Sequence, residues 1–469
     1  MLLWSRYNTL FHSDRFGYFL YNAISNSFFK LNKTYFRFLE QIKSNSHVSV
    51  AEINHQFHNL LIDKKILVKE GEEKKILQKK HYQRNLISFD SSRLDLSLCP
   101  TLMCNFRCPY CFEHSQQIST VMNKDTINRL ISFIEKQNSA NRLYITWYGG
   151  EPTLVFNVIQ EITKKVKELD ITFEGAGLVT NAYLLNKSKI DKLNDLKITN
   201  IQITIDGPEC LHDSRRVLAN GKPTYQKIMN NIEELMGSSY EGSCNIRVNL
   251  DKNNLSGFFD LRADLTERFK GKKFSVYGGL VDTSPSHKYD HSCNLCAKEW
   301  KEFTIAQYRH LSDSPSEGIY PINNVFNICS ANSINSFVIG PEGEIYKCWE
   351  DVGKHEMIVG SIFKDESIAN SDLVSLYSIG TDPFLEPTCL DCKVLPICGG
   401  GCSNRRLRVK FFHEESLEFC SLYKDNLTEY LLEYYDTLLT KELCGDILNA
   451  NEIQNNESGY KILHPGSEN

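Results

Sequence analysis

Between residues 92 and 280, short apolar segments alternate with longer amphipathic ones. Leu94, Leu96 and Leu98 alternate with polar neighbours and predict a strand. Five further strand patterns follow, each after a helical pattern: RLYITW, GLVTN, NIQITID, NIRVNL and KFSVYGGL. Strands that alternate with helices form parallel sheets with right-handed crossovers. The pattern predicts an α/β fold with a partial (β/α)6 TIM-like barrel, because a complete eight-unit barrel needs more chain.

The first 85 residues follow a different pattern. The segment GYFLYNAISNSFFKL predicts a β-hairpin with a polar turn near Asn22 to Asn26. Two segments with helical spacing follow, KTYFRFLEQI and VAEINHQFHNLLIDKKIL, and the charged run KEGEEKKILQKKHYQR predicts a solvated helix or linker. A hairpin with helices is typical of a small winged-helix-like unit. The alternative is a packing extension of the main domain.

Beyond residue 310 the regular patterns shorten, and cysteine and glycine become frequent. From Leu427 the segment LTEYLLEYYDTLLTKEL predicts an acidic amphipathic helix, followed by a polar tail that we expect to be frayed. We therefore expect four units. They are an N-terminal unit over residues 1–85, the barrel over 90–305, a cysteine-rich domain over 310–425, and a C-terminal helix and tail over 426–469.

The composition narrows the classes of function. The chain has 469 residues, a net charge of −5, 24% charged and 41% hydrophobic residues, which is typical of a globular protein in solution. We expect no nucleic-acid partner, no membrane span and a cytoplasmic location. Most of the 16 cysteines gather in three groups, Cys99–Cys111, Cys293–Cys348 and Cys389–Cys420. In a reducing compartment such grouping favours metal or redox sites over disulfides.

Three cysteines follow the first predicted barrel strand in the segment CNFRCPYC, from Cys104 through Cys108 to Cys111. Sites in barrel folds gather at the carboxyl ends of the strands. Three thiolates can hold three irons of a [4Fe–4S] cluster and leave the fourth iron open for a ligand. A zinc site completed by a residue such as His114 is the alternative. The loop resembles the cluster motif of the radical S-adenosylmethionine (radical SAM) superfamily, whose open iron binds SAM.

Motifs at the ends of later strands resemble the same superfamily. GGEP follows the second predicted strand and resembles the motif for the SAM amino group. TNA follows the third and resembles the ribose-side TNG motif, with Ala182 in place of glycine. DGP with HDSRR follows the fourth, as in the peptide-modifying branch, and Arg216 aligns with the arginine near the SAM carboxylate. The resemblance implies SAM binding by Tyr110, Gly149, Gly150, Glu151, Thr180, Asn181, Asp206 and Arg216.

Other polar residues near these motifs leave two interpretations open. His212 and Asp213 act either in catalysis or as a helix cap. Arg247 and Asn249 lie on the fifth strand, where they either point into the barrel or form a polar strand face. No residue is assigned as catalytic.

Seven C-terminal cysteines follow the spacing C-x18-C, then C-x2-C-x5-C-x3-C-x17-C. The pattern resembles the SPASM domain, an auxiliary-cluster module behind radical SAM domains that modify peptides. A pair of zinc knuckles is the alternative. The resemblance implies two auxiliary iron–sulfur clusters besides the single [4Fe–4S] cluster of the barrel. The inner one would be held by Cys329, Cys348 and Cys402, and the outer one by Cys389, Cys392, Cys398 and Cys420.

The inner set lacks one cysteine that many relatives carry, because Asn335 occupies that position. The cluster there either has an open iron for a substrate thiolate, uses another ligand, or is smaller. Cys293 and Cys296 form a further C-x2-C, for which an incidental pair is favoured over a redox pair. The remaining cysteines, Cys99, Cys210, Cys244 and Cys444, are expected to pack as small apolar side chains.

The resemblance implies a radical SAM oxidoreductase that matures peptides. A 5′-deoxyadenosyl radical would abstract hydrogen from a ribosomally made precursor peptide (a RiPP precursor) and so install a cross-link or an oxidised residue. The N-terminal unit resembles leader-binding winged-helix units and would recognise the peptide by strand addition. A flavodoxin- or ferredoxin-like protein would donate the electron.

Two other functions are weighed against peptide maturation. An anaerobic sulfatase-maturing enzyme has the same layout, but there an aspartate follows the second SPASM cysteine, and here Trp349 follows Cys348. A non-catalytic iron–sulfur protein is disfavoured by the complete cluster loop and SAM motifs. The peptide, the bond formed, the electron donor and the oligomeric state are not contained in the sequence.

Overall fold

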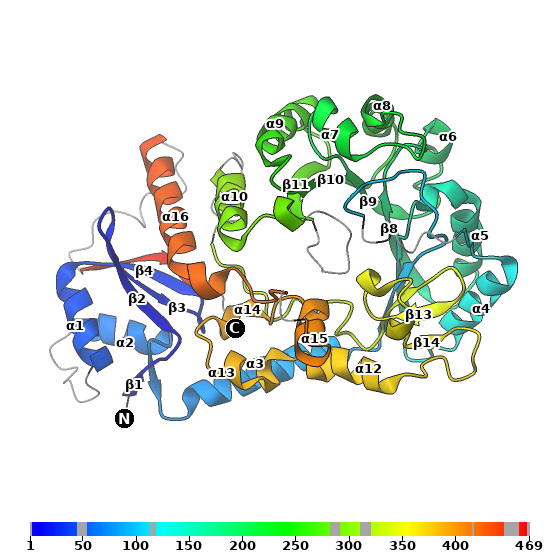
Figure 1. Ribbon diagram of the computed structural model, residues 1–469. Helices are drawn as coiled ribbons and strands as arrows, with labels where there is room; N and C mark the ends of the chain where they lie inside the picture. The colour runs from blue at the N-terminus through cyan, green and yellow to red at the C-terminus, as the bar shows by residue number, and fades with distance from the viewer. Residues whose placement is uncertain are drawn as a thin grey trace.

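The computed structural model places a small N-terminal unit and a large sheet at opposite ends of the molecule, with cysteine-rich segments between them (Figure 1). Across the described chain, no helix is long and apolar enough to cross a lipid bilayer. The structure describes residues 2–44, 54–111, 113, 119–281, 291–309, 320–414, 417–444 and 459–466.

The six strands expected for the barrel are present as parallel neighbours in the order expected from the sequence. This confirms the α/β fold with a partial barrel. The sheet stays open at its last strand among the described residues, as a six-unit barrel should. The strands are β6 (Arg93–Leu98), β7 (Arg142–Trp147), β8 (Thr172–Thr180), β9 (Ile198–Thr204), β10 (Ser243–Leu250) and β11 (Phe274–Leu280).

Amphipathic helices cover the outer face of these strands (Figure 1). Along β10, Ile246 and Val248 are buried against them, while Arg247 and Asn249 alternate on the other face. That alternation puts apolar side chains under the helices and polar ones toward the inside of the barrel. The helices are α4 (Lys124–Glu135), α5 (Phe156–Val166), α6 (Lys187–Ile190), α7 (Glu209–Arg215), α8 (Tyr225–Gly237), α9 (Phe258–Arg268) and α10 (Ala297–Arg309).

The cysteine-rich region extends the barrel sheet at the β6 edge. β12 (Ser336–Ile339) pairs with β6 in parallel, and β13 (Glu344–Tyr346) and β14 (Gly360–Ser361) continue the sheet in antiparallel order. The sequence pattern did not predict this continuity. Short helices complete the region: α12 (Ser371–Ser375), α13 (Pro387–Leu390), α14 (Leu395–Cys398) and α15 (Ser403–Phe411).

The N-terminal unit contains the predicted hairpin and helices. Its strands are β2 (Asn8–Ser13), β3 (Gly17–Asn22) and β4 (Ser27–Leu31), and its helices are α1 (Lys33–Ser44) and α2 (His55–Asp63). A small antiparallel pair, β1 (Leu2–Trp4) and β5 (Leu67–Lys69), leads into α3 (Glu72–Ser88).

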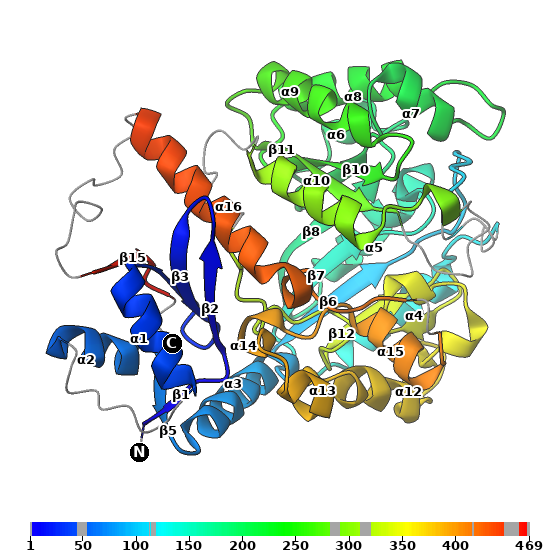
Figure 2. The same cartoon turned by 60° about the vertical axis from the view of Figure 1, so that its left-hand side comes forward.

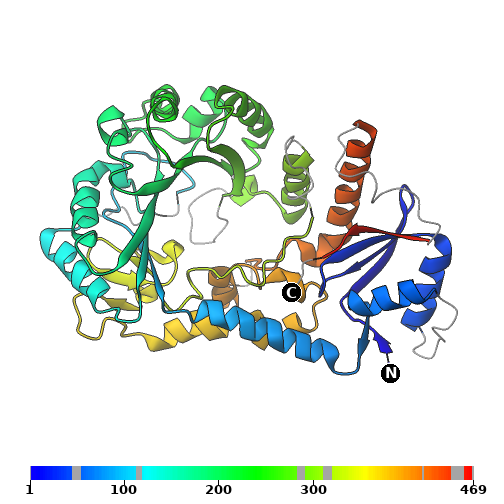
Figure 3. The ribbon, with the colours of Figure 1, turned by 180° about the vertical axis from the view of Figure 1, so that it is seen from behind.

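Helix α3 differs from the predicted solvated helix or linker. It runs from the N-terminal unit along the cysteine-rich region to the first barrel strand (Figure 3). Lys80 and Arg84 are buried on it, and Arg84 Nη1 donates to the carbonyl of Val325 at 2.6 Å. The helix itself was predicted, and most of its side chains are exposed or half-buried. One face is buried because long basic side chains can bury their stems against a neighbouring domain that the sequence window does not contain.

The C-terminus returns to the N-terminal unit. Helix α16 (Tyr423–Cys444) packs Leu431 and Tyr434 on the face of the hairpin that carries Phe19 and Phe28 (Figure 2). Strand β15 (Tyr460–His464) then pairs antiparallel with β4. For residues 459–466 the expected frayed tail is therefore wrong, because a sheet edge far away in the sequence provides hydrogen-bond partners for a polar segment.

Candidate functional site

The three-cysteine loop follows β6 and is held by backbone hydrogen bonds on two sides. Gly150 N donates to Thr101 O at 3.2 Å and Glu151 N donates to Met103 O at 2.8 Å. On the other side, Arg107 N donates to Val217 O at 2.9 Å. The loop is therefore fixed between the end of β7 and the segment after α7.

The thiols of Cys104, Cys108 and Cys111 lie close enough to influence one another. Burial raises the pKa of Cys104 to about 12, with Glu151 and Cys108 adding to it. Burial also raises the pKa of Cys111 to about 12, with Glu113 and Cys108 contributing. Neutral buried thiols of this kind become thiolates when they bind a metal cation.

Two glycines allow the loop to approach the end of β7. Gly149 has a φ of 108°, which disfavours any side chain. A Cβ atom on Gly150 would overlap the carbonyl oxygens of Leu102 and Met103. The Gly-Gly pair is therefore required by the backbone contact itself.

Glu151 ties together the ends of β7 and β8. Its Oε1 accepts from Thr153 N at 2.9 Å, Thr153 Oγ1 at 2.5 Å and Thr180 Oγ1 at 2.7 Å. Its Oε2 accepts from Asn181 N at 2.7 Å. Oε1 has its protein donors in place, so Oε2 is the oxygen that can receive a further donor such as an ammonium group.

Asn181, which donates to Glu151, also contacts the cysteine loop, and Ala182 follows it. Asn181 Nδ2 donates to Asn105 Oδ1 at 2.8 Å and lies 4.0 Å from the sulfur of Cys104. Ala182 has a φ of 58°, the left-handed conformation that a glycine adopts easily. The alanine therefore preserves the backbone shape that the TNG motif would have, at the cost of some strain.

Asp206, at the end of β9, is the centre of a buried polar network. It accepts from Tyr110 Oη through Oδ2, from Arg215 Nε at 3.2 Å, and from Asn249 N at 3.2 Å. Arg216 Nη1 donates to Tyr110 Oη at 2.8 Å. These contacts bring Tyr110, Asp206 and Arg216 together beside Cys108, as expected for residues of one site.

The network also contains residues that sequence reasoning missed. Arg215 Nη1 donates to Asp251 Oδ2 at 2.6 Å, and both side chains are buried. The adjacent arginine pair in HDSRR was the available signal, because two neighbouring arginines on a short helix need two separate sets of acceptors. Asn249 Nδ2 lies 3.5 Å from Tyr110 Oη, so the polar face of β10 points toward the site.

His212 and Asp213 have structural contacts. Burial lowers the pKa of His212, which accepts from Asp206 N and faces Thr224 Oγ1 at 3.0 Å. Asp213 Oδ1 accepts from the backbone N–H groups of Thr224 and Tyr225 at the start of α8. The helix-cap interpretation therefore describes Asp213, and the neutral ring of His212 supports the backbone of Asp206.

Three buried polar atoms beside the cysteine loop have no hydrogen-bond partner among the described residues: Asn105 Nδ2, Glu113 Oε1 and Arg216 Nε. An unsatisfied buried group costs about 1–3 kcal/mol. Such a group of orphaned atoms fits a polar ligand with both positive and negative charges. Burial raises the pKa of Glu113 to about 7. The residues present thus fit a zwitterion such as SAM.

A cluster and a single metal ion require different spacings of the three cysteines. No three cysteine, histidine or carboxylate side chains of the described chain converge on one metal position. In a [4Fe–4S] cluster each thiolate binds a different iron, so its cysteines stand further apart than the ligands of one zinc ion. His114 lies outside the described residues.

Members of the inner cysteine set lie near one another, and so do Cys392, Cys398 and Cys420 of the outer set. Burial raises the pKa of Cys348, and Cys329 contributes to this and to the raised pKa of Cys402. In the outer set, Cys392 and Cys420 contribute in the same way to the pKa of Cys398, after burial. These proximities agree with the two ligand sets, which remain predictions.

Buried cations surround the auxiliary cysteines. Arg406 is fully buried, and its Nη1 and Nη2 donate to the sulfur of Cys389 at 3.4 and 3.3 Å. Lys347 is also fully buried and donates to Ser333 O at 2.5 Å and Ser336 O at 2.7 Å. Burial lowers its pKa to about 7. The sequence did not predict these residues as part of the site, because nothing in the local sequence shows that a charged side chain near a cysteine is buried.

Asn335 has a structural role at the position of the absent cysteine. Its Nδ2 donates to Ser91 O at 2.9 Å and to Arg93 O at 3.0 Å, at the start of β6. The side chain thus anchors β12 to the barrel sheet.

Trp349 connects the inner cysteine set with the SAM motifs. Its ring stacks on Tyr148, with centroids 5.2 Å apart and an angle of 17°. Tyr148 immediately precedes Gly149, and Trp349 immediately follows Cys348. The indole is 44% exposed, so this stack presents an aromatic surface between the two sites.

The remaining cysteines differ in their burial. Cys99 and Cys244 are buried, which confirms their expected packing. Cys210 is exposed on α7, so its expected burial was wrong. Cys293 is half-buried and Cys296 exposed, and the side chain of Cys444 lies outside the described residues.

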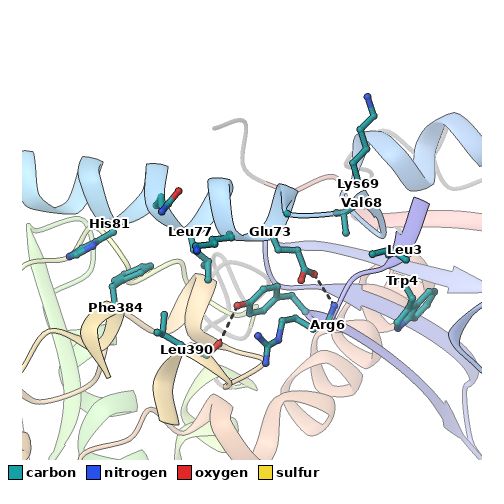
Figure 4. Close-up of a pocket in the computed structure, with 14 residues that line it drawn as sticks. Leu3, Trp4, Arg6, Val68, Lys69, Glu73, Leu77, His81, Phe384 and Leu390 are labelled. Carbon is teal, nitrogen blue, oxygen red and sulfur yellow. Dashed lines mark hydrogen bonds between the residues drawn. The ribbon is translucent and has the colours of Figure 1, made fainter. Parts of the chain in front are cut away.

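A cavity of about 590 Å³ lies at the seam between the N-terminal unit, α3 and the outer cysteine segment (Figure 4). Leu3, Trp4, Leu77 and Phe384 form its apolar part, and Leu390 lies between two outer cysteines. Tyr7 Oη donates to Leu390 O at 3.4 Å across the seam. None of the residues that line it belongs to the SAM motifs.

Comparison with known proteins agrees with this geometry. Residues 98–265 match the family model of the radical SAM superfamily. This part of the chain has the sequence pattern of a radical SAM domain, and the chain as a whole is similar in its layout to SPASM-type radical SAM maturases.

Curated relatives belong to two groups. The chain is 21% identical to the radical SAM cyclopropyl synthase TigE of Paramaledivibacter caminithermalis, over 86% of this chain and 89% of that protein. It is 23% identical to a cysteine-type anaerobic sulfatase-maturating enzyme of Clostridium novyi, over 65% and 86%. The chain is thus similar to radical SAM enzymes of both groups.

Among solved structures, native anSMEcpe with bound AdoMet and the Kp18Cys peptide superposes with a TM-score of 0.59. The two chains are 20% identical, and the match covers 76% of this chain and all of that one. At this identity the likeness shows a shared fold.

Replacing Glu151 by Gln should weaken the site without removing a cysteine. The side-chain NH2 group of glutamine is a donor, and it would face one of the N–H or O–H groups that now donate to the carboxylate of Glu151. We expect the free energy of unfolding to fall by about 1–3 kcal/mol and SAM binding to weaken. Denaturation and calorimetric titration of the reconstituted protein measure both. The exposed Glu168→Gln variant is the control, and equal behaviour of the two would contradict the role of Glu151.

Proposed function

We propose that the protein cleaves SAM reductively and modifies a ribosomally made precursor peptide, installing a cross-link, such as a thioether, or an oxidised residue. The observation that carries this proposal is that the three-cysteine loop lies against three strand-end motifs, beside unpartnered buried polar atoms. When bound, the [4Fe–4S] cluster and SAM would supply a 5′-deoxyadenosyl radical that abstracts a hydrogen atom from the peptide.

Each residue of the site has a distinct task in this proposal. Cys104, Cys108 and Cys111 would hold the cluster. Arg216 has an unpartnered Nε beside Cys108 and would bind the SAM carboxylate. Glu151 Oε2 would accept from the SAM amino group, while Thr180 and Asn181 lie on its ribose side. The buried network around Asp206 keeps these groups in place and excludes water.

The auxiliary cysteines would hold two further iron–sulfur clusters. Their surroundings support an anionic occupant, because Arg84, Lys347 and Arg406 are buried cations that need negative partners. Thiolate-bound clusters provide that charge. The inner cluster would accept the electron released as the product bond forms, or bind a substrate thiolate at an open iron. A flavodoxin- or ferredoxin-like protein would be the donor, in a reducing cytoplasm.

A peptide substrate is supported by two observations. One related protein, anSMEcpe, was solved with the Kp18Cys peptide bound, and that protein shares the fold of this chain. The N-terminal unit contains an antiparallel sheet, and the edges of such sheets can recognise extended peptides through main-chain hydrogen bonds. We therefore propose that the N-terminal unit binds the precursor peptide.

The alternative function, sulfatase maturation, is favoured by the Clostridium novyi relative. The structure lacks the corresponding acid at the relevant position of the described chain, where Trp349 stacks on Tyr148. The nearest aspartate, Asp351, is buried and accepts from Tyr377 Oη at 2.5 Å and from Asn404 Nδ2 at 2.9 Å. These contacts give Asp351 a structural role, and peptide maturation remains our proposal.

Replacing Cys104, Cys108 and Cys111 by Ala should abolish SAM cleavage. After anaerobic reconstitution, the parent protein with SAM and dithionite should form 5′-deoxyadenosine, because three thiolates leave one iron open for SAM. Chromatography with mass detection measures the product. Absence of 5′-deoxyadenosine from the parent protein with its clusters loaded would overturn the proposed enzyme function.

Replacing Cys389 and Cys392 by Ala should separate cleavage from modification. The cysteine loop stays intact, so 5′-deoxyadenosine should still form, while the modified peptide should be lost. Iron content and electron paramagnetic resonance check that the barrel cluster is present. Full peptide modification by this variant would show that the outer cysteines are not needed.

Substrate choice should distinguish the two functions. We expect a mass change in a short cysteine- or glycine-rich peptide encoded beside the gene, and none in a peptide carrying a sulfatase maturation sequence. Mass spectrometry of both peptides after incubation decides between them. Conversion of the sulfatase peptide alone would establish the alternative function.

A further inference from the structure

The two edges of the sheet in the N-terminal unit differ in whether another strand covers them. Its strands lie in the order β15, β4, β3, β2, so β2 forms one edge of the described sheet. The other edge would be β4, but β15 from the C-terminus covers it. Figure 2 shows this strand beside α1, far along the chain from the hairpin that it completes.

β15 is more exposed than β4, the strand that it joins. All of its residues are half-buried or exposed, and the side chain of Ile462 is 41% exposed. In β4, by contrast, Phe28 and Phe29 are fully buried. Removing β15 would therefore leave the apolar core of the sheet in place.

Because of a β-bulge, side chains of β15 contact both faces of the sheet. Tyr460 pairs with Leu31, and Ile462 pairs with Phe29, on the face that packs against α1 and α2. The register then shifts, and His464 pairs with Phe28, which belongs to the opposite face. An extra residue in one strand moves the following side chain to the other face of a sheet.

Two ring side chains make the specific contacts. The ring of Tyr460 lies 4.6 Å from that of Phe57, and the ring of His464 stacks on Tyr320 at 3.9 Å with an angle of 14°. Aromatic sites of this kind, one on each side of a strand edge, select side chains by shape while main-chain hydrogen bonds bind any sequence. The edge thus resembles a peptide-binding site that already contains a peptide.

We propose that the β4 edge is the docking site for the precursor peptide and that β15 is its internal occupant. The docking segment would be extended and carry two ring residues four positions apart, one for the Phe57 side and one for the Tyr320 side. The inference rests on the proposed peptide substrate and names where and how that peptide binds. Tail and peptide exclude each other, because both use the same hydrogen-bonding groups of β4.

A binding experiment tests the docking site without cofactors. A fluorescein-labelled peptide with the sequence of residues 457–469 is titrated into the full chain and into a chain that ends at residue 456. We expect the shortened chain to bind the probe at least tenfold more tightly, by fluorescence anisotropy. The probe variant with Tyr460→Ala and His464→Ala should not bind, whereas Ile462→Ala should bind as the parent probe does.

The same probe tests the precursor. Each short peptide encoded beside the gene is added to the shortened chain with bound probe, and one of them should displace it. That peptide should bind the full chain more weakly than the shortened one. Failure of every such peptide to displace the probe, or equal binding to both chains, would overturn the inference.

Two controls keep the outcome interpretable. If the shortened chain does not fold, the full-length Tyr460→Ala, His464→Ala variant replaces it, because it loosens β15 without deleting it. SAM cleavage without peptide should be equal in all these chains, since β15 lies outside the SAM site. Cleavage without probe binding would leave the proposed function intact and reject the docking site, so the two failures are distinguishable.

Discussion

The cysteine loop passes so close to the end of β7 that a Cβ atom on Gly150 would collide with the carbonyl oxygens of Leu102 and Met103 in the loop. Much of the site follows from this contact. The backbone bonds of Gly150 and Glu151 fix the loop, and the carboxylate of Glu151 then fixes Thr180 and Asn181 at the end of β8. A rigid support of this kind holds reacting groups in place before a ligand arrives, which is the main contribution a protein makes to cofactor chemistry.

Buried charged side chains lie around both groups of cysteines. Near the SAM motifs Glu113, Glu151 and Asp206 are buried, and Asp206 is paired with the buried Arg215. Beside the auxiliary cysteines Lys347 and Arg406 are buried, and so is Asp351. A buried ion without a partner costs several kcal/mol, so such groups need partners of opposite charge. The unpartnered Nε of Arg216 suits a carboxylate, and the guanidinium of Arg406, which donates to the sulfur of Cys389, suits a thiolate. These contacts agree with the proposed cofactors.

The sequence predicted what depends on local pattern, and missed what depends on distant partners. The six barrel strands and the hairpin follow from periodicity, and the cysteine loop follows from spacing. The pairing of β12 with β6, the burial of Lys80 and Arg84, and the return of β15 to β4 each join segments more than 200 residues apart. No window along one chain contains both partners. The prediction that Cys210 is buried was wrong for a related reason. The residue type favours burial, but only the fold determines on which side of α7 the side chain lies.

In the proposed function, peptide recognition and radical chemistry take place in different parts of the molecule. The N-terminal unit lies at one end of the molecule and the barrel sheet, which carries the SAM motifs, at the other, with the auxiliary region between them (Figure 1). Binding energy gained at a remote segment of a substrate can hold its reacting part in place. A peptide anchored at the hairpin sheet would pass the auxiliary cysteines and the Trp349–Tyr148 stack before it reached the cysteine loop. The site itself would then need few contacts to the peptide, since its residues would serve to hold the proposed cofactors.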